Sequence, residues 1–217
     1  MPPLHRHQLV RLSDDGWRSV RERPWEPAVH ACFAHWAAHR LPLVVTQQAA
    51  QVVAAGEISL GLAAPLFSQR RRIALAVERR HIAAFDEFPN IDEFALGGAW
   101  RRLCVSLVSL GTTACVYGSH GWQRLSGLSY VHARSDVDLW TAVADAEHAD
   151  AVAAVLAAFE DAQAPRLDGE LLLPDGRAFA WREWLAWRAG RSRAILAKTL
   201  KGASLVWSNA GAATQPC

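Results

Sequence analysis

The stretch ACVYGSHGWQRLSGLSYVHARSDVDL, residues 114–139, decides the fold because it joins two strands through a glycine turn. Ala114–Tyr117 is apolar enough for a short buried strand, and it ends at Gly118-Ser119, where glycine lets the backbone turn sharply. Further on, Asp136 and Asp138 alternate with apolar residues, and residues two apart share one face of a strand. The pattern predicts two neighbouring carboxylates on a strand that follows a glycine-serine turn.

The two acids need a cation between them. Asp136 and Asp138 repel each other, so each raises the pKa of the other unless a positive charge lies close by. Mg²⁺ suits such ligands, because it takes one or two carboxylates together with substrate phosphates. At the turn, the Ser119 hydroxyl and the neighbouring N–H groups can hold phosphate oxygens, and Gly118 permits close approach. We expect a Mg²⁺ site and a phosphate site here, with helix capping as the structural alternative for Ser119.

The rest of the chain reads as alternating helices and strands. Hydrophobic spacing predicts helices at Pro27–His39, Ile91–Leu110, Glu147–Gln163 and Glu183–Leu200. It predicts further strands at Leu41–Val45, Ile58–Leu62, Ile73–Val77, Leu167–Leu173, Ala178–Trp181 and Ser204–Trp207. This order indicates an α+β fold, a mixed sheet covered by helices. We expect a smaller N-terminal α/β domain over residues 1–90 and a catalytic domain over residues 91–217.

Composition excludes several classes of protein. The 217 residues are 51% hydrophobic and 20% charged, which argues against a disordered chain. The net charge of +2 is too small for a dedicated nucleic-acid binder. No apolar run is long enough for a membrane span, and Met1–Arg11 lacks the apolar core of a signal peptide. The four cysteines form no C-x-x-C pair, so we expect free thiols and a cytoplasmic location.

These motifs together resemble the nucleotidyltransferase superfamily, and within it most closely the phosphoribosyl-dephospho-CoA transferases, also called malonate decarboxylase holo-acyl-carrier-protein synthases. The resemblance runs from about Leu41 to Trp207. Its sharp motifs are Tyr117-Gly118-Ser119, residues 125–130 (LSGLSY), residues 135–139 (SDVDL), Asp168-Gly169-Glu170, residues 180–183 (AWRE) and Lys198-Thr199. The chain departs from the family pattern at Val137 and Ser126, where Leu and Thr are more usual, and it lacks the proline that often precedes the Gly-Ser pair.

The resemblance implies an activity and a set of site residues. The family transfers a prosthetic group from 2′-(5″-triphosphoribosyl)-3′-dephospho-CoA to a serine of the malonate decarboxylase acyl carrier protein and releases pyrophosphate. Asp136, Asp138 and Glu170 are the expected metal ligands and catalytic residues, with Asp168 as the alternative third acid. Gly118, Ser119 and Lys198 are expected to hold phosphate, although Lys198 also fits a solvated helix face.

Some alternatives stay open at this point. The chain also fits another Mg²⁺-dependent nucleotidyltransferase, or an inactive module that binds a carrier protein or nucleotide. A basic cluster, Arg70-Arg71-Arg72 with Arg79-Arg80, fits an acidic carrier protein, the phosphates of a CoA-like ligand, or a solvated surface. We expect the N-terminal domain to bind either the CoA part of the donor or the carrier.

Overall fold

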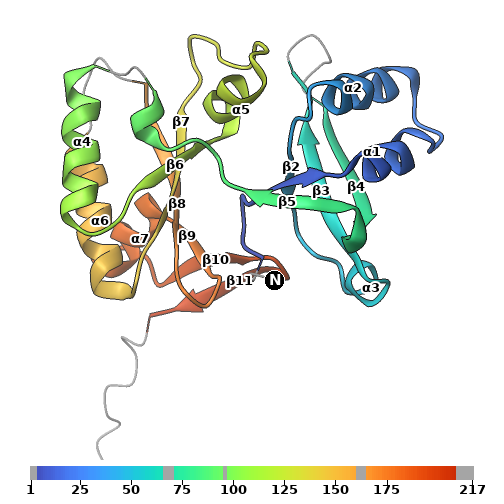
Figure 1. Ribbon diagram of the computed structural model, residues 1–217. Coiled ribbons are helices and arrows are strands. Elements are labelled where there is room, and N and C mark those ends of the chain that lie inside the picture. Colours follow the sequence, from blue (N-terminus) through green and yellow to red (C-terminus); the bar gives the residue numbers. More distant parts are fainter. Residues whose placement is uncertain (1–3, 66–70, 95–96, 160–164, 209–217) are drawn as a thin grey trace, which may run out of the picture.

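The computed structural model describes residues 4–65, 71–94, 97–159 and 165–208 (Figure 1). These residues form a five-stranded sheet of order β4-β3-β2-β1-β5 and a six-stranded sheet of order β11-β10-β9-β8-β7-β6. Helices pack against both sheets, which confirms the predicted α+β class. None of the helices in the described ranges is long and apolar enough to cross a membrane.

The first sheet is built from the N-terminal part of the chain and is antiparallel throughout. Its strands are β1 (Leu9–Leu12), β2 (Leu43–Val45), β3 (Glu57–Ala63), β4 (Arg72–Glu78) and β5 (Ile82–Asp86). Its helices are α1 (Asp14–Arg21), α2 (Pro27–Ala38), α3 (Ala50–Ala54) and the short 3-10 turn η2 (Arg79–His81).

Strand β4 shows how the sequence pattern makes this layer. Ile73, Leu75 and Val77 are buried in the core that α1 and α2 cover, while Arg72 and Ala74, on either side of Ile73, are exposed. This period of two places the apolar side chains of the strand on one face and leaves the other face free.

The second sheet carries the stretch that opened the sequence analysis. Its strands are β6 (Ala114–Tyr117), β7 (Val137–Ala142), β8 (Leu167–Leu172), β9 (Ala178–Ala180), β10 (Ala194–Thr199) and β11 (Gly202–Trp207). Only the β7–β8 pair is parallel among these described pairings. The helices are α4 (Gly98–Ser109), α5 (Gly118–Ser126), α6 (Ala146–Ala158) and α7 (Trp181–Arg188), with the 3-10 turn η3 (Ile91–Glu93) before α4.

Two predicted helices were wrong in extent. The helix expected over Glu183–Leu200 ends at Arg188, because Gly190 adopts φ +69° and the chain then returns as strand β10. The helix expected over Ile91–Leu110 is divided into the η3 turn and α4, with residues 95–96 outside the described part. Strand β1 and helix α1 were not predicted at all. The end of the helix expected over Glu147–Gln163 falls partly on residues 160–164, which also lie outside the described ranges.

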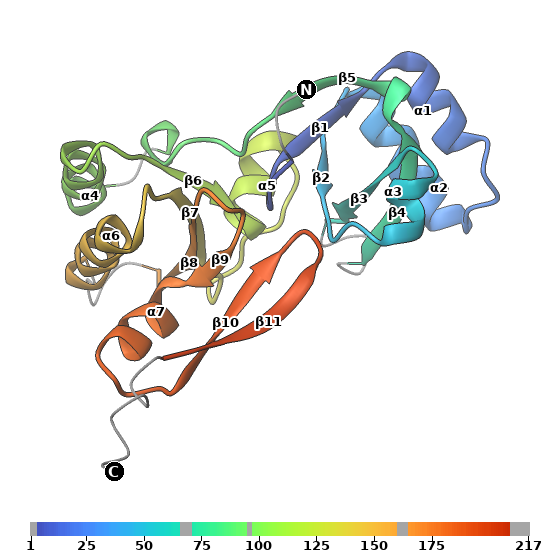
Figure 2. The same ribbon diagram turned by 90° about the horizontal axis from the view of Figure 1, so that it is seen from below.

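The two sheets contact each other through several segments. The Tyr130 hydroxyl donates to the Ala63 carbonyl at 2.6 Å, and the backbone N–H of Gln48 donates to the Leu200 carbonyl at 2.6 Å. Figure 2 shows the β10–β11 hairpin reaching toward the first sheet. The boundary near residue 90 stays a prediction. It falls where the chain passes from β5 to the second sheet, and Asn90 already forms a bridge with Cys115.

Candidate active site

The turn after β6 brings a backbone loop against an acid. Strand β6 ends at Tyr117 and α5 begins at Gly118, whose φ of +63° favours glycine. A Cβ atom on Gly118 would lie 2.1 Å from Oδ2 of Asp138, so any other residue would clash with this carboxylate. Tyr117 and Asp138 are register partners in the β6–β7 ladder. The predicted glycine-serine turn and the predicted acidic strand are therefore in direct contact.

Three aspartates gather beside this turn. Asp138 and Asp168 are register partners in the parallel β7–β8 ladder, and Asp136 lies two residues before Asp138. Burial raises the pKa of Asp138 to about 6, and the charges of Asp168 and Asp136 add to this rise. Arg166 lies 3.8 Å from Asp136 and 3.7 Å from Asp168 in exposed surroundings. Negative charge is thus concentrated around Asp138, and no residue in the described ranges forms an ion pair with it.

This donor set suits Mg²⁺. Carboxylate oxygens are hard ligands, and the raised pKa of Asp138 shows that its charge is poorly compensated by the protein. Within the described ranges, no three His, Cys, Asp or Glu side chains converge closely enough to enclose a metal ion by themselves. Mg²⁺ does not need such an enclosure, because it usually keeps several waters and shares substrate phosphates with one or two carboxylates. The residues therefore fit a metal that binds together with a phosphate-bearing substrate.

Glu170 has different surroundings from the aspartates. It is buried, and its carboxylate accepts from Arg6 at 3.1 and 3.2 Å and from Lys198 at 2.8 Å, with His7 Nε2 at 2.9 Å. Burial alone would raise the pKa of Glu170, but the hydrogen bonds and charges of His7, Lys198 and Arg6 lower it overall. Its register partner on β7 is Trp140, not an acid. A metal role for Glu170 stays a prediction, and the geometry favours the alternative third acid, Asp168.

Lys198 lies on strand β10 and not on a helix as expected. Its ammonium group is held by Glu170, and its side chain is partly exposed. Its phosphate-binding role therefore also stays a prediction.

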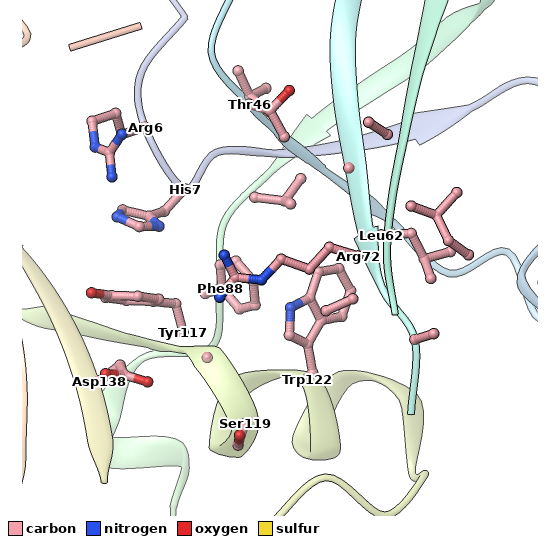
Figure 3. A pocket seen from close by; sticks show the side chains of 18 of the residues that line it. Arg6, His7, Thr46, Leu62, Arg72, Phe88, Tyr117, Ser119, Trp122 and Asp138 are labelled. Atoms are coloured by element: carbon pink, nitrogen blue, oxygen red, sulfur yellow. The ribbon is translucent and has the colours of Figure 1, made fainter. Parts of the chain in front are cut away.

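A cavity of about 670 Å³ opens between the two sheets and reaches the glycine-serine turn. Figure 3 shows side chains from both sides of it, with Tyr117 and Asp138 on the side of the second sheet. This volume is in the range of pockets that hold nucleotide-sized ligands. The Gly118-Ser119 turn and Asp138 thus lie in the wall of a space that can accept a large substrate.

The N-terminal segment contributes residues that sequence reasoning missed. Arg6 and His7 line the cavity, and the His7 ring stacks on Tyr117 with ring centroids 4.0 Å apart. His7 adopts φ +65°, which turns the segment toward the second sheet before β1 begins. No sequence motif identifies these two residues as part of the site. They are more than 160 positions away from Glu170 in the sequence.

Ser119 is available for a ligand. The N-cap of α5 is Tyr117 without a side-chain capping bond, and the Ser119 hydroxyl has no hydrogen-bond partner among the residues described. If Ser119 holds phosphate as the sequence predicts, Ser119→Ala should weaken binding of a triphosphate-bearing ligand by about 1–2 kcal/mol, the value of one hydrogen bond. Titration calorimetry measures this effect. Ser109→Ala on helix α4 is the matched control and should leave donor affinity unchanged, and equal affinities for the two variants would remove Ser119 from the site.

Glu170 is expected to stabilise the fold. Glu170→Gln keeps the shape of the side chain but leaves Arg6 and Lys198 without their carboxylate, so we expect a loss of about 2–3 kcal/mol in the free energy of unfolding. Because the folded pKa is lowered, this stabilisation is present above about pH 4.5 and is lost as the pH falls below that value. Urea unfolding at pH 4 and pH 8 measures it. Glu87→Gln, which breaks a more exposed pair with His5, should cost under about 0.5 kcal/mol.

The chain is similar to known proteins over most of its length. Residues 86–209 match the family model described as phosphoribosyl-dephospho-CoA transferase MdcG C-terminal domain, and residues 5–88 match the corresponding N-terminal domain model. A phosphoribosyl-dephospho-CoA transferase of Bradyrhizobium diazoefficiens is 35% identical over 187 residues, which is 83% of this chain and 82% of the relative. A protein of the same name from Xanthomonas campestris pv. campestris is 33% identical over 207 residues, 93% of each chain. No solved structure matches the chain with significance.

Proposed function

Because the chain belongs to the phosphoribosyl-dephospho-CoA transferase family, we propose that it transfers the phosphoribosyl-dephospho-CoA group from 2′-(5″-triphosphoribosyl)-3′-dephospho-CoA to a serine hydroxyl of the malonate decarboxylase acyl carrier protein. Pyrophosphate is the leaving group in this proposal. Family membership makes the chain a transferase, while the carrier, the serine and the leaving group are the parts that experiment must decide.

One observation carries the proposal. The aspartates of β7 and β8 lie beside a glycine-serine turn whose Gly118 contacts Asp138, and this turn opens to a cavity of about 670 Å³. Phosphoryl transfer to a hydroxyl needs this combination of a phosphate-binding backbone, acids for a metal and space for a nucleotide.

The proposed chemistry assigns separate tasks to these residues. The serine oxygen of the carrier forms a bond to the first phosphorus of the triphosphate, and the bond from that phosphorus to pyrophosphate breaks. Asp136, Asp138 and Asp168 would hold Mg²⁺, which supplies positive charge for the transferring phosphate and the leaving oxygens. Asp168 accepts the proton of the serine hydroxyl and releases it to solvent. The Gly118-Ser119 turn donates hydrogen bonds to the departing pyrophosphate.

The partners follow from the same proposal. The donor is a nucleotide of CoA type, and the acceptor is a carrier protein that presents its serine at the open side of the cavity. We propose a cytoplasmic location, since both partners of such a reaction are expected there.

The test combines two readouts from one reaction. The chain is incubated with the donor, Mg²⁺ and the apo carrier protein, and the intact mass of the carrier and the released pyrophosphate are both measured. We expect the carrier to gain one prosthetic group for each pyrophosphate released, and a carrier with its serine replaced by alanine should gain none. Pyrophosphate release onto a different acceptor would instead identify another nucleotidyltransferase, and an unchanged carrier without pyrophosphate would indicate a binding module.

A further inference from the structure

The first sheet forms the other wall of the cavity. Its lining comes from β2, β3 and β4 and is largely apolar, with Val44, Ala63 and Ala74 among the residues that contribute. One long charged side chain enters from this side, that of Arg72 at the start of β4 (Figure 3). This wall has no part in the transfer chemistry described above.

Arg72 is free to bind a ligand. It makes no ion pair and no side-chain hydrogen bond within the part of the chain that the structure describes, and its side chain extends into the cavity from the side opposite Asp138. Arg6, which also lines the cavity, is already engaged by Glu170. An unpaired guanidinium group beside an apolar wall matches the needs of a phosphate attached to an organic group.

The neighbouring arginine has a different role. Arg71 pairs with Glu26 at 2.5 Å, whereas Arg72 is the register partner of Ala63 on the cavity wall. Adjacent residues of an extended chain point to opposite sides. Arg71 therefore contacts Glu26, while Arg72 faces the cavity. Arg70, the third member of the predicted cluster, lies outside the described residues.

Gly61 lets Thr46 pack closely on the wall beside Arg72. A Cβ atom there would lie 2.8 Å from Cγ2 of Thr46 and 3.7 Å from Cγ1 of Val44, both of which line the cavity. Gly61 pairs with Ala74 across the β3–β4 ladder, so two small residues lie side by side on this part of the wall.

We propose that this wall binds the dephospho-CoA part of the donor and that Arg72 binds its diphosphate. The inference rests on the proposed function, because that function places the triphosphate end of the donor at the Gly118-Ser119 turn. The remaining and larger part of the donor must then extend along the cavity away from Asp138. The first sheet offers apolar surface and one free guanidinium group in that direction. The N-terminal part of the chain thus recognises the donor and not the carrier.

Two probes separate the two ends of the donor. Dephospho-CoA carries the diphosphate and the organic part, and tripolyphosphate represents the triphosphate end. Titration calorimetry with each probe is applied to the full chain, to Arg72→Gln and to the matched control Arg71→Gln. We expect Arg72→Gln to raise the Kd for dephospho-CoA at least tenfold and to leave the Kd for tripolyphosphate within twofold. Arg71→Gln should change neither value by more than twofold.

The outcomes distinguish this inference from the proposed function. A loss of tripolyphosphate binding with normal dephospho-CoA binding in Arg72→Gln would assign the arginine to the leaving group and overturn the inference. Unchanged binding of both probes, or equal losses in the two variants, would overturn it as well. Failure of the unmodified chain to bind dephospho-CoA has the same consequence. Transfer to the carrier by the unmodified chain tests the proposed function separately, since binding of dephospho-CoA requires no transfer.

Discussion

Asp138→Asn is expected to abolish transfer and to stabilise the fold at the same time. The substitution removes a carboxylate from the proposed metal site, and loss of such a ligand should lower the transfer rate by roughly a thousandfold, about 4 kcal/mol in the activation free energy. The raised pKa of Asp138 shows that its charge is unfavourable in the folded chain without metal. Removing that charge should therefore raise the free energy of unfolding.

The pH dependence of this stabilisation follows from the direction in which folding shifts the pKa of Asp138. The pKa of Asp138 rises from 3.8 to about 6 on folding, so the cost of its charge appears as the pH rises through this interval and is full above it. Because Asp138 is only partly buried, we expect Asp138→Asn to gain about 1 kcal/mol at pH 8 and nothing below pH 4.

Urea unfolding with a metal chelator at both pH values measures the gain, and the carrier mass assay measures transfer. Asp150→Asn is the control, since Asp150 pairs with Arg188 and its pKa is lowered. This variant should keep full transfer and lose a little stability. Near-normal transfer by Asp138→Asn would end the assignment of the active site.

Gly169→Ala is expected to prevent stable folding of the second sheet. Gly169 adopts φ +143°, and a Cβ atom there would lie 1.8 Å from the carbonyl oxygen of Leu139 on β7. This oxygen belongs to the backbone and cannot move away without breaking the β7–β8 ladder that pairs Asp138 with Asp168. We expect a loss of at least about 4 kcal/mol in the free energy of unfolding.

Gly176→Ala separates the cost of backbone strain at positive φ from the cost of the steric clash with Leu139. Gly176 has φ +82°, but an added Cβ atom would meet nothing within 4 Å. It should cost only the backbone strain, about 1–2 kcal/mol. Thermal or urea unfolding of both variants gives the comparison, and similar losses would show that the contact with Leu139 is unimportant.

Local sequence patterns correctly predicted the two central strands and the turn between them. The strand at Ala114–Tyr117, the glycine turn after it and the acidic strand were all recognisable, because burial with period two and a glycine at positive φ leave direct marks in the chain. The C-terminal helix was predicted too long. The segment 194–199 is short and apolar enough for either a helix or a strand. Pairing with β9 and β11 makes it a strand.

Local sequence patterns were also insufficient to identify every residue of the candidate site. Asp168 and Glu170 are two residues apart, so the sequence could not separate them as the third acid. The strand register favours Asp168, because it aligns Asp168 with Asp138, whereas Glu170 is bound by Arg6 and Lys198. Such alignments depend on contacts between distant segments, which no spacing within one segment reveals.

The contact of Arg6 and His7 with Glu170 also has a consequence for synthesis of the chain on the ribosome. Residues 6 and 7 leave the ribosome early, whereas Glu170 emerges when most of the chain has been made. The β strands of the second sheet can pair before that contact forms, but the buried carboxylate keeps its full set of partners only when the first residues return to it. Contacts of such long sequence separation form late and slowly. The segment before β1 can therefore take its final position only after β8 has been synthesised.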